Sequence, residues 1–283
     1  MITQFENGFI TKSKLNELVD GINALDIVVL TENITKTVGI GGDFATLNLA
    51  IDWCKKVLPN GYTVTLKLVV GFVMAESVLI ESCDLRFVKI VSSNTDAIII
   101  DKDSIKEEYV FKGIKSYMPY IYEVNFTMNG TMSLASAKTF MYLDGLGAYS
   151  EYRGALNNIE YMARVYSCAE IYFYIEGNSL YGYTFDFNAK GNVIGIFSAI
   201  KFGFQVDWYS EVSFGNGVIT LSRNGIVVSK SSKFSMPYGN ITMADSYYKA
   251  FTVLDGGIIQ ANGTDGTLSQ TANTITANGI IFK

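Results

Sequence analysis

Five short segments recur along the second half of this chain at a nearly constant step. They are AEIYF (169–173), AKGNV (189–193), SEVSF (210–214), SKFSM (232–236) and GGIIQ (256–260). Each starts with a small residue, continues with a charged residue or glycine, and in four of the five has an apolar third residue. A repeat of roughly 20–25 residues predicts a solenoid.

The residue types select one kind of solenoid. The Leu-x-x-Leu-x-Leu signature of leucine-rich repeats is absent, and helical repeats need about 33 residues or more. In a parallel β-helix each coil stacks about 4.8 Å above the last, so inward side chains keep their size class while outward ones vary. Corners that need positive φ explain the returning GNG (215–217), YGN (238–240) and ANG (261–263).

We therefore predict an all-β protein, a right-handed, single-stranded parallel β-helix over residues 38–263, with roughly nine coils between residues 60 and 263. Runs rich in β-branched residues at 64–70, 77–81, 86–91 and 97–101 predict its first strands. Residues 264–283 are expected to terminate the stack.

Two helical segments are expected before the first coils. Residues 1–37 form a predicted attachment segment, in which Leu15, Leu18, Ile22 and Leu25 make a short coiled-coil seam. The seam is too short to be stable alone, so it either packs on its own domain or pairs with copies of itself. Glycines 39, 41 and 42 predict a tight turn, and residues 44–58 a helix that caps the first coil, with Asp43 or Thr46 at its start.

Composition excludes several kinds of function. The chain has 283 residues, a net charge of −5 and no histidine, which argues against general nucleic-acid binding and excludes any Ser-His-Asp or Cys-His mechanism. The three cysteines, Cys54, Cys83 and Cys168, are odd in number and widely spaced, so we expect buried thiols rather than disulfides or a metal site. No cofactor and no membrane insertion are predicted.

Three stretches resemble proteins of bacteriophage and prophage tails. VGIGGDFATLNLAI, followed by strands and DLRFVKIVSS, resembles the start of the β-helix domains of tail fibres and tailspikes, which are pectin-lyase-like. ANGTDGTLSQTANTITANGIIFK resembles their C-terminal ends, and FENGFITKSKLNELVDGINAL is similar to the start of other short phage structural proteins. The resemblance implies a homotrimer in the virion tail, held by other tail proteins through its N-terminus, that contacts a bacterial surface polysaccharide.

GDFATLNLAI is also similar to the entry of pectin esterases, which share the β-helix. The nearest match to their Asp-Phe-x-Phe-Gly motif begins at Asp186, but the second Phe and the Gly are missing and no Arg-x-Trp follows. Esterase activity is therefore not expected.

Two functions remain, together with a purely structural role as a tail spacer or tip. A polysaccharide depolymerase, acting as a glycoside hydrolase or lyase, needs paired carboxylates. Asp186, Asp207 and Glu211 are the candidates. Asp186 and Asp207 are separated by one period of the repeat and could stack on successive coils, with Glu170 on the face of Glu211 two coils away. Solvated surface charges explain the same residues without catalysis.

The second function is adhesion to a surface glycan without catalysis, and the aromatic residues favour it. The chain has 18 Tyr and 18 Phe, with tyrosines clustered in SYMPYIY (116–122), AYSEY (148–152), IYFY (171–174) and SLYGYTFDF (179–187). Phe is expected in the core, whereas Tyr and Trp suit half-wet surfaces. The predicted glycan-binding residues are Asp207, Trp208, Tyr209, Tyr183 and Tyr181.

Overall fold

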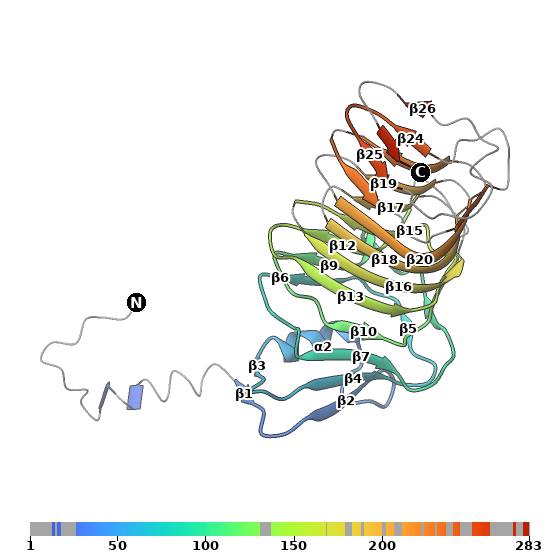
Figure 1. Cartoon of the computed structure of the whole chain (residues 1–283). Coiled ribbons are helices and arrows are strands. Elements are labelled where there is room, and N and C mark those ends of the chain that lie inside the picture. The colour runs from blue at the N-terminus through green and yellow to red at the C-terminus, as the bar shows by residue number, and fades with distance from the viewer. Residues whose placement is uncertain are drawn as a thin grey trace, which may run out of the picture.

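The chain winds into a stack of coils whose strands form long parallel sheets (Figure 1). The structure is a computed structural model. It describes residues 27–130, 137–167, 169–178, 183–187, 190–199, 202–206, 211–221, 224–229, 231–235, 240–243, 251–260, 274–275 and 280–282, with Ser13, Lys14, Asn16 and Glu17. Every strand pair among these residues is parallel.

The largest sheet has twelve strands. In spatial order they are β2 (Ile34–Val38), β4 (Val64–Leu68), β7 (Val88–Ser92), β10 (Tyr120–Tyr122), β13 (Tyr149–Gly154), β16 (Glu170–Asn178), β18 (Lys190–Ala199), β20 (Glu211–Leu221), β22 (Lys233–Ser235), β25 (Ile258–Gln260) and β27 (Ile280–Phe282), with β23 (Asn240–Met243) also on β20. Nine of them, β4 to β25 along this path, lie within residues 60–263, as predicted.

A second sheet of nine strands runs beside it. Its strands are β6 (Val78–Glu81), β9 (Tyr109–Ile114), β12 (Thr139–Asp144), β15 (Tyr161–Val165), β17 (Tyr183–Phe187), β19 (Phe202–Val206), β21 (Asn224–Val228), β24 (Phe251–Val253) and β26 (Thr274–Ile275). A third sheet has only four strands, β5 (Val73–Met74), β8 (Ile98–Ile100), β11 (Phe126–Met128) and β14 (Leu156–Asn157). The predicted early strands are confirmed, whereas β5 was not expected.

The coils change shape midway along the stack. Up to β15 the chain visits the twelve-, four- and nine-stranded sheets in turn, and this part contains the longest coils, such as the one that separates the partners Ile121 and Tyr152. From β16 onward its described strands lie only in the two larger sheets and alternate between them, except that β22 and β23 both belong to the twelve-stranded sheet. A much shorter coil separates Glu170 from its partner Lys190. Strands β16, β18 and β20 are correspondingly long, with 9, 10 and 11 residues. The visible sequence period therefore belongs to the shorter coils.

The predicted repeat register holds for four of the five segments. Glu170, Lys190, Glu211 and Lys233 are successive partners, but Lys233 pairs with Ile258 rather than Gly257, so the fifth segment was aligned one residue too early. The prediction of a corner at Gly215-Asn216-Gly217 is wrong. These residues belong to β20, where the register against β18 shifts. One extra residue in a strand is a β-bulge, which glycine accommodates easily. Of the other two proposed corner motifs, YGN is described only at Asn240, and ANG lies outside the described residues.

Large apolar side chains fill the interior of the stack. Phe126, Phe140 and Tyr152 pack with ring centroids 5.1–6.4 Å apart, and Phe173 lies 5.5 Å from Tyr152 on the next coil. All four are fully buried. The Tyr152 hydroxyl donates to the carbonyls of Val124 and Ala155, at 2.8 and 2.9 Å, which satisfies its polar group inside the core.

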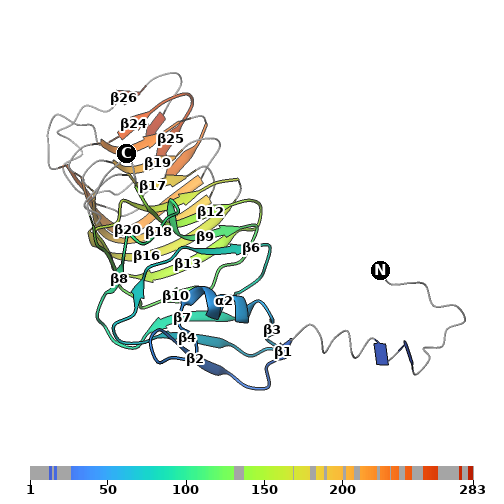
Figure 2. The same ribbon diagram turned by 180° about the vertical axis from the view of Figure 1, so that it is seen from behind.

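Helix α2 (Leu47–Cys54) covers one end of the stack, near the base in Figures 1 and 2. It begins at the N-cap Thr46, and Asn48 donates from its side chain to the carbonyl of Ser77, directly before β6, the terminal strand of the nine-stranded sheet. The helix is shorter than the predicted 44–58. Its expected last turn is replaced by β3 (Val57–Leu58), which pairs with β1 (Val28–Val29).

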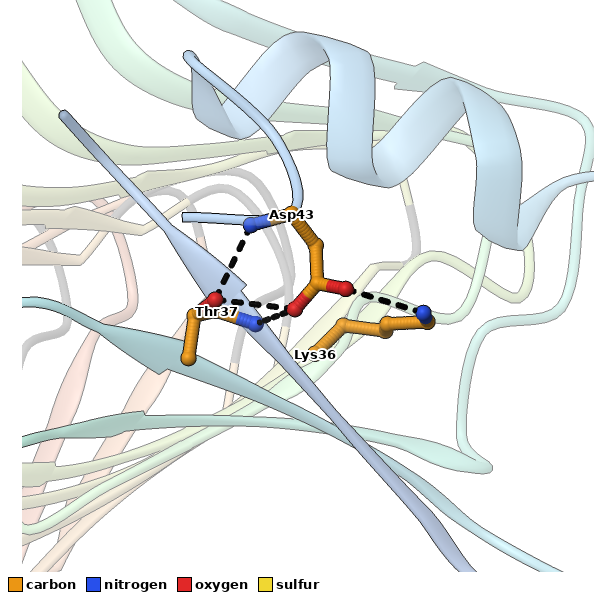
Figure 3. Close-up of polar contacts among 3 residues, drawn as sticks. All are labelled: Lys36, Thr37 and Asp43. Atoms are coloured by element: carbon orange, nitrogen blue, oxygen red, sulfur yellow. Dashed lines mark hydrogen bonds and ion pairs between the residues drawn. The ribbon is translucent and has the colours of Figure 1, made fainter. Parts of the chain in front are cut away.

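The free edge of β2 is blocked by its own following turn (Figure 3). The Asp43 carboxylate accepts from the Thr37 backbone N–H and hydroxyl, both at 2.8 Å, and from Lys36 Nζ at 2.9 Å. These contacts lower the pKa of Asp43, chiefly through the Thr37 N–H. Lys36 pairs in register with Leu66 of β4, whose side chain is buried in the core. A charged side chain therefore occupies the interior position of the first strand of this sheet. The turn that bonds to the edge of β2 and the charge of Lys36 both oppose the pairing of another strand with this edge.

The sheets extend past both predicted domain boundaries. Strand β2 begins at Ile34, inside the predicted segment 1–37, and β27 reaches Phe282, inside the predicted segment 264–283. Of the predicted coiled-coil seam, the structure describes only polar neighbours, which are helical at Ser13, Lys14, Asn16 and Glu17. Within the described part of the chain, no helix has the length and apolar character needed to cross a bilayer.

Candidate functional site: a tyrosine face on the twelve-stranded sheet

Three tyrosine-rich segments that are far apart in the sequence lie on neighbouring strands. SYMPYIY includes β10, AYSEY leads into β13 and IYFY lies in β16, and these strands pair in that order at the front of the stack in Figure 1. The strand period of two turns alternate residues outward. The outward tyrosines Tyr117, Tyr120, Tyr122, Tyr149 and Tyr172 are all half-buried, and we call this set the tyrosine face.

A column of outward residues crosses the middle of this face. Glu151 pairs with Tyr172 on β16, and because Tyr152 pairs with Ile121, Tyr120 lies on the other side of Glu151. Two tyrosines therefore flank one carboxylate, on three successive coils about 4.8 Å apart. No cation lies over Tyr120 or Tyr172 among the described residues. Their rings are available to pack on an apolar ring surface, with a carboxylate beside them to accept hydrogen bonds.

Cationic side chains lie over other rings of the face. Arg86 Cζ is 4.1 Å from the ring centroid of Tyr117. Lys89 Nζ and Arg153 Cζ lie 4.0 and 5.2 Å from the centroid of Tyr122, and Arg153 also donates to the Tyr122 hydroxyl at 2.9 Å. Such contacts are weakly favourable at exposed sites.

Two titratable groups at the margin of the face have shifted pKa values. Asp84 accepts a bidentate interaction from Arg86, and this hydrogen bonding lowers the pKa of the Asp84 carboxyl. Burial, supported by the nearby charge of Glu151, raises the pKa of Tyr149 to about 12. Tyr149 therefore remains a neutral hydroxyl at any physiological pH.

The candidate carboxylate Glu211 stands in a ladder of alternating charge. Its register partners are Lys190 on one side and Lys233 on the other, and Lys190 in turn pairs with Glu170. The predicted relation of Glu170 and Glu211 on one face, two coils apart, is confirmed. Lys233 Nζ lies 3.5 Å from Glu211 Oε1. Alternating charges on paired strands stabilise the sheet, which accounts for these carboxylates without catalysis.

The predicted stacking of Asp186 on Asp207 does not fit the register. Asp186 pairs with Arg164 in β15 and with Gln205 in β19, because the coil between β17 and β19 is shorter than the repeat period suggested. Asp207 itself lies outside the described residues. Asp186 and Glu211 belong to different sheets and are not register partners of one another.

Most of the predicted glycan-binding residues cannot be placed. Trp208, Tyr209, Asp207 and Tyr181 lie outside the described residues. Tyr183 begins β17, where its backbone pairs with Phe202, but its side chain is not described. The tyrosine face takes their place as the candidate site. Its three segments were visible as tyrosine clusters in the sequence, but their adjacency depends on the unequal lengths of the coils between them.

The described part of the chain offers neither a metal site nor a reactive cysteine. It contains no group of three or more Cys, Asp or Glu side chains suited to a metal ion. Cys54 is buried, and burial raises the pKa of its thiol to about 12, so it is inert. Cys83 is only half-buried, rather than buried as predicted, and its thiol pKa is also raised by desolvation. Cys168 lies outside the described residues.

No protein-family model and no curated protein matches this chain.

Proposed function

We propose that this protein is a right-handed parallel β-helix that binds a bacterial surface glycan through its tyrosine face. The parallel pairing of strands from successive coils supports the β-helix, and the right hand follows from the strong preference of parallel crossover connections for that hand. The phage tail fibre or tailspike assignment rests on the sequence resemblance alone.

The observation that carries the proposal is the column Tyr120, Glu151 and Tyr172. Sugar rings present apolar C–H faces and a rim of hydroxyls. Half-exposed tyrosine rings pack against such faces while keeping their own hydroxyls in water. The Glu151 carboxylate between them accepts hydrogen bonds from sugar hydroxyls. Because the aromatic positions recur on successive coils, a polymer is a better match for the face than a single small molecule.

A homotrimer is part of the proposal, and the four-stranded sheet supports it. The outward residues of its four strands are Val73, Ile99, Thr127 and Asn157, none of which is charged. Val73 and Ile99 are 47% and 37% exposed in a single chain. Neighbouring copies would cover these apolar side chains, whereas the charged outer faces of the other two sheets would remain in solvent.

Depolymerase activity is the second candidate, and the structure favours it less. The described candidates, Asp186 and Glu211, each have a cationic register partner and do not pair with one another. A purely structural spacer would need no tyrosine face at all.

The test is binding of the purified protein to an array of bacterial surface polysaccharides. Exchanging Tyr120 and Tyr172 together for alanine should abolish binding while the thermal unfolding temperature changes little. Tyr142→Ala, at a half-buried tyrosine of the nine-stranded sheet, is the matched control and should bind as the parent does. Undiminished binding by the double variant would rule out the tyrosine face as the site.

A reducing-end assay on the same polymers separates binding from cleavage. We expect no release of reducing ends by the parent protein. Release that disappears on replacing Asp186, Asp207 and Glu211 by alanine would establish a depolymerase, either a glycoside hydrolase or a lyase, and contradict the binding-only proposal.

A further inference from the structure

The charged side chains of the tyrosine face balance one another. The strands of the face and the segments that lead into them comprise residues 64–68, 84–92, 117–123, 149–154 and 170–173. Their charged side chains are the cations Lys67, Arg86, Lys89 and Arg153 and the carboxylates Asp84, Glu123, Glu151 and Glu170. Four cations and four carboxylates leave no net charge, although the whole chain carries −5. The face therefore has no long-range field that would gather ions of either sign.

Three of the four cations are already engaged with groups of the protein. Arg86 forms an ion pair with Asp84. Arg153 donates to the Tyr122 hydroxyl at 2.9 Å and lies over the Tyr122 ring. Lys89 Nζ lies 4.0 Å from the centroid of the same ring. An anionic ligand would have to compete with these contacts.

The two carboxylates nearest to the rings have neighbours as well. Glu170 has Lys190 as its register partner on β18. Tyr149 lies two residues before Glu151 on the same side of β13, and a hydrogen bond between these two side chains contributes to the raised pKa of Tyr149. Arg153 follows two residues after Glu151 on that side, about 7 Å along the strand. A ligand ammonium that reached Glu151 would therefore approach Arg153, whereas a ligand carboxylate on the flanking rings would lie beside Glu151.

We infer that the tyrosine face binds an uncharged polysaccharide, whose repeating unit carries no carboxylate, phosphate or amino group. This inference rests on the proposed function and narrows it. A ligand ion would give up its hydration for a surface whose charges are already balanced. Sugar hydroxyls lose little in the same exchange, because they donate to the Glu151 carboxylate and accept from the tyrosine hydroxyls of the face. The rings of Tyr120 and Tyr172 then pack on the apolar face of the sugar.

The experiment compares polymers that differ only in charge. Neutral bacterial polysaccharides are tested for binding, each beside a derivative in which some primary hydroxymethyl groups have been oxidised to carboxylates. At low salt the parent protein should bind the neutral form about fivefold more tightly, which is the effect of a like-charge contact with Glu151 at a partly exposed site. At about 1 M salt, where the screening length is only ~3 Å, the two forms should bind about equally.

Two variants locate the effect. Glu151→Gln removes the repelling charge and keeps an oxygen that accepts hydrogen bonds, so the oxidised polymer should bind within about twofold of the neutral one. Glu81→Gln is the matched control, because Glu81 is an exposed carboxylate of β6 in the nine-stranded sheet. It should keep the parent's preference for the neutral form, and both variants should keep the parent's circular dichroism spectrum.

The outcomes separate this inference from the proposed function. Binding of charged polymers alone, or equal binding of the neutral and oxidised forms at low salt, would overturn the inference. If the Tyr120 and Tyr172 double variant abolishes that binding, glycan binding at the tyrosine face still stands. A preference for the neutral form that is unchanged in Glu151→Gln would also overturn the inference. If no polymer of either kind binds the parent, both the inference and the glycan-binding proposal fail.

Discussion

Replacing Glu160 by glutamine should destabilise this protein more than any surface substitution. Glu160 and Lys102 form an ion pair with 2.5 Å between Oε1 and Nζ, and their side chains are 2% and 4% exposed. The other oxygen of Glu160 accepts from the backbone N–H of Lys138, whose own ammonium donates to the carbonyls of Lys106 and Glu107. One carboxylate therefore helps to hold turns from three coils together.

The expected loss follows from the burial. Removing one partner of a buried ion pair leaves an uncompensated charge and costs about 3–5 kcal/mol. For a chain of this size each kcal/mol shifts the unfolding temperature by roughly 2 °C, so Glu160→Gln should lower it by about 6–10 °C. Lys102→Met combined with Glu160→Gln removes both charges and keeps an acceptor for the Lys138 N–H. The double variant should recover most of the loss, to within about 1–2 kcal/mol of the parent.

The assay is urea unfolding followed by circular dichroism, with thermal unfolding at a fixed scan rate. Asp52→Asn is the matched control, because Asp52 pairs with Lys55 at 2.8 Å but its side chain is 66% exposed. It should cost less than about 1 kcal/mol. A Glu160→Gln variant as stable as the Asp52→Asn control, or a double variant no better than the single one, would refute the argument from desolvation.

Four further substitutions test the corners, the core and the blocked edge. Lys115 has a φ of 47°, which glycine adopts more easily, so Lys115→Gly should raise the free energy of unfolding in urea by up to about 1 kcal/mol. Gly145 stacks above Lys115 with a φ of 92°, and a Cβ at this position would lie only 2.7 Å from Lys115 Cγ. Gly145→Ala should therefore lower the free energy of unfolding by about 1–2 kcal/mol. Tyr152→Phe removes the hydroxyl that donates to the buried carbonyl of Val124 and should lose about 1–2 kcal/mol, although the carbonyl of Ala155 keeps the Phe126 N–H at 2.8 Å. An unchanged midpoint would mean that another donor satisfies the Val124 carbonyl. Asp43→Asn should lower the unfolding temperature at pH 7 and increase end-to-end association in light scattering. Because the pKa of Asp43 is lowered in the folded state, its stabilisation is fully present above the ordinary carboxyl pKa of about 4 and is lost as the pH falls below that, so the variant and the parent should converge in acid.

The fold could be predicted where coil length is nearly constant. Between Glu170 and Lys233 successive partners advance by almost equal steps, and the predicted register is confirmed. The alignment slipped at Ile258, where the coil becomes longer. The helix at 44–58 was overestimated because Leu58 fits the helical period as well as it fits β3. Local periodicity cannot show that Val29, far upstream in the sequence, is the strand partner of Leu58.

The candidate site was predictable in composition but not in position. The three tyrosine segments stand out in the sequence, yet the coil between Ile121 and Tyr152 is much longer than the next one, between Tyr149 and Glu170, so the segments have no visible period. Because the coil length could not be known from the sequence, Asp186 was predicted to stack on Asp207, although its partner is Gln205. An error of two residues keeps a side chain on the correct face but gives it the wrong neighbour.

The sequence alone determined that this chain forms stacked parallel strands. Every coil has a similar cross-section, so the side chains that point inward must be of similar size from coil to coil, whereas those that point outward are free to vary. It also predicted that phenylalanine belongs to the interior, as Phe126, Phe140 and Phe173 do, although Cys83, which was expected there as well, is only half-buried. Only the tertiary structure decided which exterior residues meet. Residues that are neighbours on the surface are separated by a whole coil in the sequence. The length of each coil depends on turns and on bulges, such as the one at Gly215, and these cannot be predicted from the alternation of polar and apolar residues.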